Sequence, residues 1–445
     1  MKTRVLVLLM LVVSVGIQAS DHVLDATKSE EKSKAPAVLT LSLREAQDYA
    51  VRENRTLRNA SLAVQEAYAQ RWQTIASMLP SVDGSYSYSN YCGYSATLSM
   101  MGNNVNISMP NVGALGVTAS VGVTGQGVVG VLLNNIAIDM KKISLEQTET
   151  ELRQSVMTSY VSVIVMEDIV ALLDSSMQNL EHLAQMTQQS VNIGVAEQTT
   201  ADQLKVRVNT LKNNINQSKR MIELARNTMR VLLAVPASTE LVLTDNADEL
   251  LSAEHVLNLL GQHFNIHNNL NYRLLEKTTD LARTNVHMAA WAYGPTVSLA
   301  YNYSNQQYYG EGGMRMTPPN LVQLTVRMPL WSSGKRAAGV IEKKIAYEEA
   351  KNTLAETTQQ LGIQYKQLCY NLNNAYETYL NEKDNIDVTK RVFESTTNKF
   401  QWGTASNLEL TNASNDLISA QSSYAQAVMS LINAQIELDT FMNNK

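Results

Sequence analysis

The feature that most constrains the fold is a pair of alternating stretches between residues 291 and 336. A helical pattern stops at Gly294-Pro295, and apolar residues then alternate with polar ones over 297–303. After a turn rich in Gly and Pro, the alternation resumes over 322–328. Strands of about ten residues with one apolar and one polar face are typical of strands that span a bilayer. A single hairpin neither covers its edges nor closes a barrel, so further strands must come from elsewhere.

The same order of elements occurs earlier in the chain. After Pro80, alternation over 82–88 is followed by a loop over about 90–111 and a second strand over 117–123. Pro80 and Pro295 are 215 residues apart. The chain is therefore predicted to be a tandem repeat in which each half supplies two strands.

Very long helical patterns follow each hairpin, over about 132–191 and 335–400. Apolar residues recur there at spacings of four and three, which is typical of coiled coils. At ~1.5 Å per residue, a helix of about 60 residues is about 90 Å long. Each pattern breaks at a glycine, Gly194 or Gly403, and a second rod returns, so we expect two antiparallel helical hairpins. Small core residues let the helices approach closely, and amide-rich outer faces suit the wall of a water-filled tube. A solid soluble coiled coil is the alternative to such a tube.

The N-terminus has the pattern of a secretory signal peptide, with Lys2 and Arg4 before an apolar run and a cleavage site after Ala19. The residues that follow are polar and aperiodic, as in a flexible lead. We therefore divide the chain into a signal peptide (1–19), a flexible N-terminal lead (20–38), a first repeat (39–240) and a second repeat (241–445).

Composition excludes several classes of function. Without Lys2 and Arg4 the chain has 34 basic and 41 acidic residues, a formal charge of −7, which argues against nucleic-acid binding. No run of 18 apolar residues follows the signal peptide, so we expect no helix that crosses a membrane. Cys92 and Cys369 lie in unlike contexts and are expected to be free thiols.

Strand number predicts an assembly of several copies. Membrane barrels need at least about eight strands, and the two hairpins supply four per chain. Three copies would give about twelve strands and four copies about sixteen. Cyclic symmetry would place the rods around the same axis as the strands. We thus expect a mainly α protein, with a transmembrane β-barrel completed by several chains and a long α-helical coiled-coil barrel in the periplasm.

These motifs together resemble the TolC family of outer-membrane efflux channels over about residues 39–442. The opening Leu41-Ser42-Leu43-Arg44-Glu45-Ala46 is similar to that of the family, and Ser42 and Glu45 have the spacing of a helix-capping box. Leu79-Pro80 before the first strand and Pro329-Leu330-Trp331 before Gly334 also fit. The family often has Asn-Pro in the first helix of each repeat, where this chain has Asn54-Arg55 and Asn268-Asn269.

The resemblance implies a homotrimer with a twelve-strand barrel in the bacterial outer membrane and a helical tunnel in the periplasm. It further implies a periplasmic adaptor protein and an inner-membrane pump of the RND or ABC type as partners. The expected function is passive conduction of small molecules or proteins to the exterior, in a tripartite efflux or type I secretion system. A soluble periplasmic coiled-coil scaffold is the alternative. We expect no enzymatic activity and no cofactor.

The two glycine turns are the first candidate site. Family members dock their adaptor through turns that resemble Ile193-Gly194-Val195 and Trp402-Gly403-Thr404. A glycine turn permits positive φ and close backbone approach, and the flanking apolar residues could be covered by a partner. A plain turn between helices is the alternative. The presence of Trp402 favours the docking interpretation, because few residues of the same chain can bury a Trp side chain at a helical tip.

A pore gate is the second candidate site. Relatives carry a carboxylate pair six and nine residues after the second tip glycine, where this chain has Glu409 and Asn412. Counted from Gly403, Glu409 is placed about two turns along the last rod, and three symmetry copies would favour cations. A solvated helix face is the alternative. Ala405 replaces an arginine that clasps the closed state in relatives, so that clasp is not expected here.

Catalytic and metal-binding motifs do not emerge from the sequence. His263 and His267 are four residues apart, but the Glu of a metalloprotease motif and a third ligand are missing, so we expect no metal site. The glycine-rich stretch 122–130 lacks the Lys and the Ser or Thr of a phosphate loop, and it is interpreted as the passage from barrel to helix.

Overall fold

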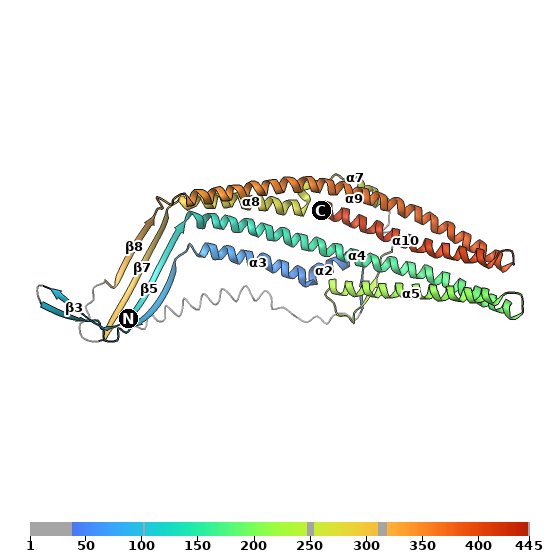
Figure 1. Cartoon of the computed structure of the whole chain (residues 1–445), viewed down its shortest axis with the longest axis horizontal. Helices are drawn as coiled ribbons and strands as arrows, with labels where there is room; N and C mark the ends of the chain where they lie inside the picture. Colours follow the sequence, from blue (N-terminus) through green and yellow to red (C-terminus); the bar gives the residue numbers. More distant parts are fainter. Residues whose placement is uncertain (1–37, 101–102, 247–252, 310–317, 444–445) are drawn as a thin grey trace.

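The computed structural model describes residues 38–100, 103–246, 253–309 and 318–443. It is an elongated molecule with a sheet at one end and two helical tips at the other (Figure 1). Mainly helical rods joined to barrel strands confirm the predicted fold class. The expected signal peptide and the lead up to residue 37 lie outside the described residues.

The sheet has the strand order β2-β5-β7-β8, formed by β2 (Ser81–Ser89), β5 (Asn111–Thr124), β7 (Thr296–Tyr309) and β8 (Asn320–Arg327). All its pairs are antiparallel. β5 and β7 pair over their whole length, from Asn111 opposite Tyr309 to Thr124 opposite Thr296. The two predicted hairpins therefore lie side by side in one open sheet with free edges at β2 and β8.

The two faces of this sheet differ in polarity. Leu324 lies opposite Leu299, which lies opposite Val121, and all three belong to one face. Thr325, Ser298 and Gly122 form the next row, on the other face. The apolar face has no partner within the described chain, and its large side chains are exposed: Val82, Tyr86, Tyr88, Leu115, Val123, Val297, Leu299, Tyr301, Tyr303, Val322, Leu324 and Val326.

The segment over about 90–111, which was predicted to be a loop, contains an additional short hairpin outside the main sheet, so that prediction was wrong. β3 (Ser95–Met100) and β4 (Asn103–Ser108) pair antiparallel in a sheet of their own. The chain enters β3 through a turn in which Cys92 and Gly93 both have positive φ, 54° and 75°. Figure 1 shows this hairpin projecting beyond the outer end of the main sheet.

The helices continue the strands as four columns, which we define here. The first column is β2, α3 (Arg55–Ala76) and α5 (Gln198–Leu232), and the second is β5 and α4 (Gly125–Asn192). The third is β7, α8 (Leu270–Ala290) and α10 (Asn407–Met442), and the fourth is β8 and α9 (Lys335–Gln401). Helices of neighbouring columns pack together, α4 against α3, α5, α8 and α10, and α9 against α8 and α10. The helical layer thus has the same order as the sheet (Figure 1).

Apolar seams hold each helical hairpin together, as the heptad spacing predicts. The α4–α5 seam buries Leu180, Leu183, Leu204 and Leu211, each at most 2% exposed. The α9–α10 seam buries Leu372, Leu410 and Leu431 completely. The breaks predicted near Gly194 and Gly403 are confirmed as the two tips.

A second layer covers the rods at mid-length. It consists of β1 (Val38–Leu41), α2 (Leu43–Glu53), β6 (Glu240–Leu243) and α7 (Ala253–Gly261). β1 and β6 pair in parallel, so a strand precedes the first helix, and β6 spans the expected boundary between the repeats at residues 240 and 241. The predicted capping box of α2 is confirmed: Ser42 N–H donates to the Glu45 carboxylate at 2.9 Å.

This second layer explains an apolar stretch in α4. Among the described residues, one helix, α4, is long and apolar enough to cross a membrane by length and composition alone. Half of that stretch is buried inside the chain, as in a core helix of a soluble domain. Tyr160 there donates to Leu41 O at 3.0 Å, and burial raises its pKa, so its hydroxyl keeps its proton.

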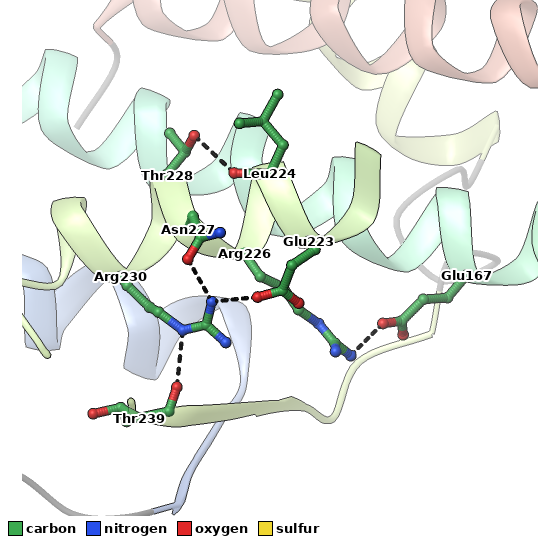
Figure 2. A network of polar contacts seen from close by, with 8 residues as sticks. All are labelled: Glu167, Glu223, Leu224, Arg226, Asn227, Thr228, Arg230 and Thr239. Atoms are coloured by element: carbon green, nitrogen blue, oxygen red, sulfur yellow. Dashed lines mark hydrogen bonds and ion pairs between the residues drawn. The ribbon is translucent and has the colours of Figure 1, made fainter. Parts of the chain in front are cut away.

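Buried polar contacts fix the return from α5 to β6. Arg230 donates from Nε to Thr239 O at 2.9 Å and from Nη1 to Glu223 at 2.7 Å (Figure 2). In the same network, Arg226 pairs with Glu167 of α4. Arg230 and Thr239 are 9% and 2% exposed, so the hydrogen bonds that hold this connection are buried.

Candidate docking tips and lumen constriction

The first tip is a helix end closed by Gly194. Gly194 has φ +77°, and its N–H donates to Val191 O at 3.0 Å. Val195 N–H reaches back to Ser190 O at 2.9 Å. This pair of bonds is a Schellman motif, which satisfies the last carbonyls of α4. Ile193 and Val195 flank the glycine and are 76% and 77% exposed, so two apolar side chains extend into solvent.

The second tip repeats this geometry. Gly403 has φ +69° and donates to Phe400 O at 3.0 Å, while Thr404 N–H donates to Lys399 O at 2.9 Å. Thr404 also donates from its hydroxyl to Lys399 O at 3.0 Å. Trp402 is 83% exposed, so the described chain does not bury it. Both tips lie together at the end of the molecule remote from the sheet (Figure 1).

Backbone conformation explains why glycine stands at each turn. A Cβ on Gly194 or Gly403 would meet no atom within 4 Å, so space is not the constraint. The constraint is the left-handed backbone, which costs a residue with a Cβ roughly 1–2 kcal/mol. The tips thus present hydrogen-bonded turns with apolar side chains on the outside.

Glu409 lies in the first turn of α10, closer to the tip than the sequence count placed it. Ser406 N–H donates to the Glu409 carboxylate at 2.7 Å, and Glu409 N–H donates to Ser406 Oγ at 3.2 Å. This capping box fixes the start of α10. Asn412 follows one turn later and is exposed. One carboxylate and one amide therefore project from α10 just above the tip.

A contact between the two helical hairpins lies near these residues. Arg207 of α5 donates from Nη1 to Asn415 of α10. Farther from the tip, Gln421 of α10 donates to Ser176 Oγ of α4 at 3.0 Å. Sequence reasoning missed both contacts, because the partners are 208 and 245 residues apart and carry no shared motif.

The two histidines and the two cysteines considered in the sequence do not form a binding site among the described residues. His267 stacks edge-to-face on Tyr272, with ring centroids 5.2 Å apart, and no group of three or more His, Cys, Asp or Glu that could hold a metal ion occurs among the described residues. Cys92 and Cys369 are free thiols.

Comparison with known proteins gives one family and several solved structures. The model of the outer membrane efflux protein family matches residues 48–235 and 266–444. CusC has a TM-score of 0.74 at 16% identity, over 91% of this chain and 92% of that chain. The outer membrane protein VceC of Vibrio cholerae has a TM-score of 0.72 at 13% identity, over 90% of this chain and 96% of that chain. The Campylobacter jejuni outer membrane channel CmeC has a TM-score of 0.69 at 15% identity, over 91% of this chain and 87% of that chain. No curated protein matches the chain in a sequence search.

Proposed function

The chain belongs to the outer membrane efflux protein family and is an outer-membrane efflux channel with a periplasmic helical part, and we propose that three copies close one passage. Each copy would contribute its four-stranded sheet to a barrel of about twelve strands. The same three copies would join their helical layers into a tube.

The observation that carries this proposal is the matching order of strands and helices. Among the described elements, no strand pairs with the outer edge of the first column and no helix packs extensively on that side, and the same holds for the outer side of the fourth column. Contact between the fourth column of one copy and the first column of the next would cover both free edges at once. Exposed apolar side chains on these columns favour that contact, namely Trp72, Leu224 and Val231 on the first and Ile341, Ile363 and Tyr370 on the fourth.

The polarity of the sheet favours a membrane barrel over the soluble scaffold. Rolled into a barrel, the exposed apolar face would contact lipid and the Ser-, Thr- and Asn-rich face would line water. A soluble protein rarely leaves so continuous an apolar face uncovered. Native mass spectrometry of the detergent-solubilised protein tests the assembly: we expect a trimer. A stable monomer would refute the barrel, and a tetramer would change its strand number.

We further propose that the two tips dock a periplasmic adaptor protein. This proposal is supported by the combination of Schellman turns with the exposed side chains of Ile193, Val195 and Trp402. Trp402→Asp should leave the trimer intact and abolish export. Leu257→Asp, at another exposed apolar position, on α7 and far from the tips, is the matched control and should export normally. Loss of the trimer in Trp402→Asp would make Trp402 structural and remove the support for docking.

The gate is proposed at Glu409 and Asn412. Three copies of Glu409 around the axis would hold cations and exclude anions, and three copies of Asn412 would add polar but uncharged groups. The Arg207–Asn415 contact would link the α4–α5 hairpin to the α9–α10 hairpin near this level, in place of an ionic clasp.

We propose that the chain is a passive conduit whose energy comes from an inner-membrane pump of the RND or ABC type. Small molecules are the proposed cargo, and secreted proteins of a type I system are the second candidate. The family consists of channel proteins, which supports conduction without catalysis. Co-purification of the cross-linked complex from its native cells would identify the adaptor and the pump.

A further inference from the structure

The passage from β8 into α9, residues 328–336, carries two strongly exposed apolar side chains, and we call it the border segment. Leu330 is 87% exposed and Trp331 is 86% exposed, the highest values among the large apolar residues that the structure describes. Met328, just before them, is 61% exposed. Met328 follows Val326 by two residues, so it continues the alternation of the apolar face of the sheet. The apolar surface of the sheet therefore extends past the last strand, to the level where the helices begin.

Arg336 ties down the backbone of the border segment. Its Nη1 donates to Pro329 O at 2.6 Å, and its Nε donates to Ser332 Oγ at 2.9 Å. Its guanidinium also lies over the Tyr293 ring, 5.1 Å from the ring centroid. Pro329 and Ser332 stand on either side of the two exposed side chains, so these are presented by a hydrogen-bonded segment. The partners of Arg336 are a carbonyl, a hydroxyl and a ring, and none of them neutralises its charge.

The charge around the border segment is positive. Residues 318–341 include Arg327, Lys335 and Arg336 and contain no Asp or Glu. Arg327 follows Thr325 by two residues and lies on the polar face of the sheet, whereas Lys335 is exposed in the first turn of α9. Lys335 and Arg336 are thus the cations that adjoin the exposed apolar side chains. A ligand that complements this surface combines an apolar part with an anionic group.

The first repeat has no such surface at the corresponding place. β5 passes directly into α4, and residues 125–140 contain no Lys or Arg. Val128 and Leu132 are each 52% exposed there, so the apolar part is present and the cations are not. We therefore expect one such binding surface per chain.

Charge distinguishes between the two occupants that this surface could have. In the proposed ring, the next copy would bring its first column beside the fourth. The end of α3 and the start of β2, residues 67–82, contain Arg71 and no Asp or Glu, so the first column offers no anion at this level. Phospholipids of the periplasmic leaflet do offer one, because the channel lies in the outer membrane with its helices in the periplasm. Trp is enriched at the headgroup level of bilayers, and basic residues near the surface attract anionic lipids.

We propose that the border segment binds an anionic phospholipid of the periplasmic leaflet, of the class of phosphatidylglycerol. Leu330 and Trp331 contact its acyl chains and glycerol group, and Lys335 and Arg336 contact its phosphate. A zwitterionic lipid binds more weakly, because its headgroup brings a cation of its own. The surface continues the apolar face of the barrel, so this inference rests on the proposed membrane barrel. It adds to conduction a lipid-selective anchor at the base of the barrel.

Quenching of Trp fluorescence by brominated lipids tests both the position and the preference. The full-length protein is reconstituted into dioleoylphosphatidylcholine vesicles that contain brominated phosphatidylglycerol or brominated phosphatidylcholine. The contribution of Trp331 is the difference between the wild type and Trp331→Phe. Brominated phosphatidylglycerol should quench this contribution at a mole fraction more than about fivefold lower than brominated phosphatidylcholine, because one basic residue near an anionic leaflet contributes about that factor in affinity.

Three variants separate the proposed contacts from general effects. Lys335→Gln should lower the preference about fivefold. Lys366→Gln is the matched control, because Lys366 is exposed on the same helix but lies 31 residues farther along, about 46 Å away, and it should keep the preference. Trp402→Phe controls the assignment of the signal. Trp402 is 83% exposed at the remote tip, so neither lipid should quench its contribution.

Several results would overturn the inference. Equal quenching of Trp331 by the two lipids would mean contact with the bilayer without selection, and protection from both would mean that a neighbouring copy covers it. A preference that survives Lys335→Gln, or that Lys366→Gln also lowers, would come from the overall charge. Native mass and bilayer conductance are measured on the same preparations. A conducting trimer without the preference would refute this inference alone, whereas a monomer that keeps the preference would refute the proposed trimer alone.

Discussion

Asn54 donates from Nδ2 to the carbonyl of Leu232 at 2.8 Å, and it thereby joins the start of α3 to the end of α5. Its Oδ1 meanwhile accepts from Thr56 N–H at 2.8 Å and caps α3. Asn269, 215 residues later, repeats the arrangement: it caps α8 and donates to Phe441 O at 3.0 Å. One buried amide in each repeat therefore stacks two helices end to end beside an unbroken long helix.

Removing either amide should destabilise the column that it joins. Asn54→Ala loses the cap, at about 1 kcal/mol, and leaves the Leu232 carbonyl without its donor, at about 1–3 kcal/mol. Asn54→Ser keeps a cap and loses only the bridge, so we expect a smaller loss of unfolding free energy. Thermal unfolding of the detergent-solubilised protein would measure both. Wild-type stability in Asn54→Ala would show that water replaces the amide.

A positive charge should be tolerated on one face of the barrel and not on the other. Leu324 lies on the apolar face, where an arginine at bilayer depth costs about 2–4 kcal/mol. Thr325 is the next residue and lies on the polar face. Leu324→Arg should lower the yield of folded barrel in outer-membrane fractions, whereas Thr325→Arg should assemble normally. Equal behaviour of the two variants would contradict the assignment of the lipid-facing side.

The tip glycines should be sensitive to a methyl group for conformational reasons alone. Gly403→Ala retains open space around Cβ but forces alanine to φ near +69°, at a cost of about 1–2 kcal/mol. Gly362→Ala, inside α9 with equally open space, is the matched control and should stabilise by about 0.5–1 kcal/mol. Hydrogen exchange at the second tip would report the difference. Unchanged protection in Gly403→Ala would mean that the turn rearranges freely.

The repeat, the barrel strands and the coiled-coil tips were predictable because each depends on local periodicity. Alternation over 297–303 marks an amphipathic strand, and heptad spacing with a glycine break marks a helical hairpin. β7 continues to Tyr309 beyond its apolar stretch, because pairing with β5 rather than its own pattern sets its length. Non-local pairing also determines β1–β6 and the Arg207–Asn415 contact, so no sequence window contains them.

The β3–β4 hairpin was missed for a different reason. Its strands have only six residues each, and they consist largely of Ser, Thr, Asn and Met. Such residues also dominate loops, and two short strands give a weak alternation signal. The position of Glu409 was misplaced because the connection from Gly403 to the helix start at Asn407 is not helical, so the residue count overestimated its height along the rod.

The last prediction concerns the charge of Glu409. Glu409 and Asn412 precede Ser430 and Asn433 by 21 residues, which is about three heptads. Ser430 and Asn433 line a groove over α4 between α5 and α10. In the proposed tube this face would line the lumen, because the second layer on the other face would obstruct the passage, so Glu409 and Asn412 would share the heptad phase of the lumen face. Three carboxylates at this phase would repel one another, attract cations and exclude anions.

Glu409→Gln removes this charge while conserving the capping box, because Gln at the third helical position also accepts from the cap residue. In planar bilayers the variant should show reduced cation preference and weaker block by divalent cations, with unchanged trimer mass. Ser406→Ala is the matched control, since it perturbs the same cap and leaves the charge in place. If Ser406→Ala alters selectivity as much as Glu409→Gln does, the effect comes from fraying of α10 rather than from charge. If selectivity and block are unchanged in Glu409→Gln, the constriction lies elsewhere along the tube.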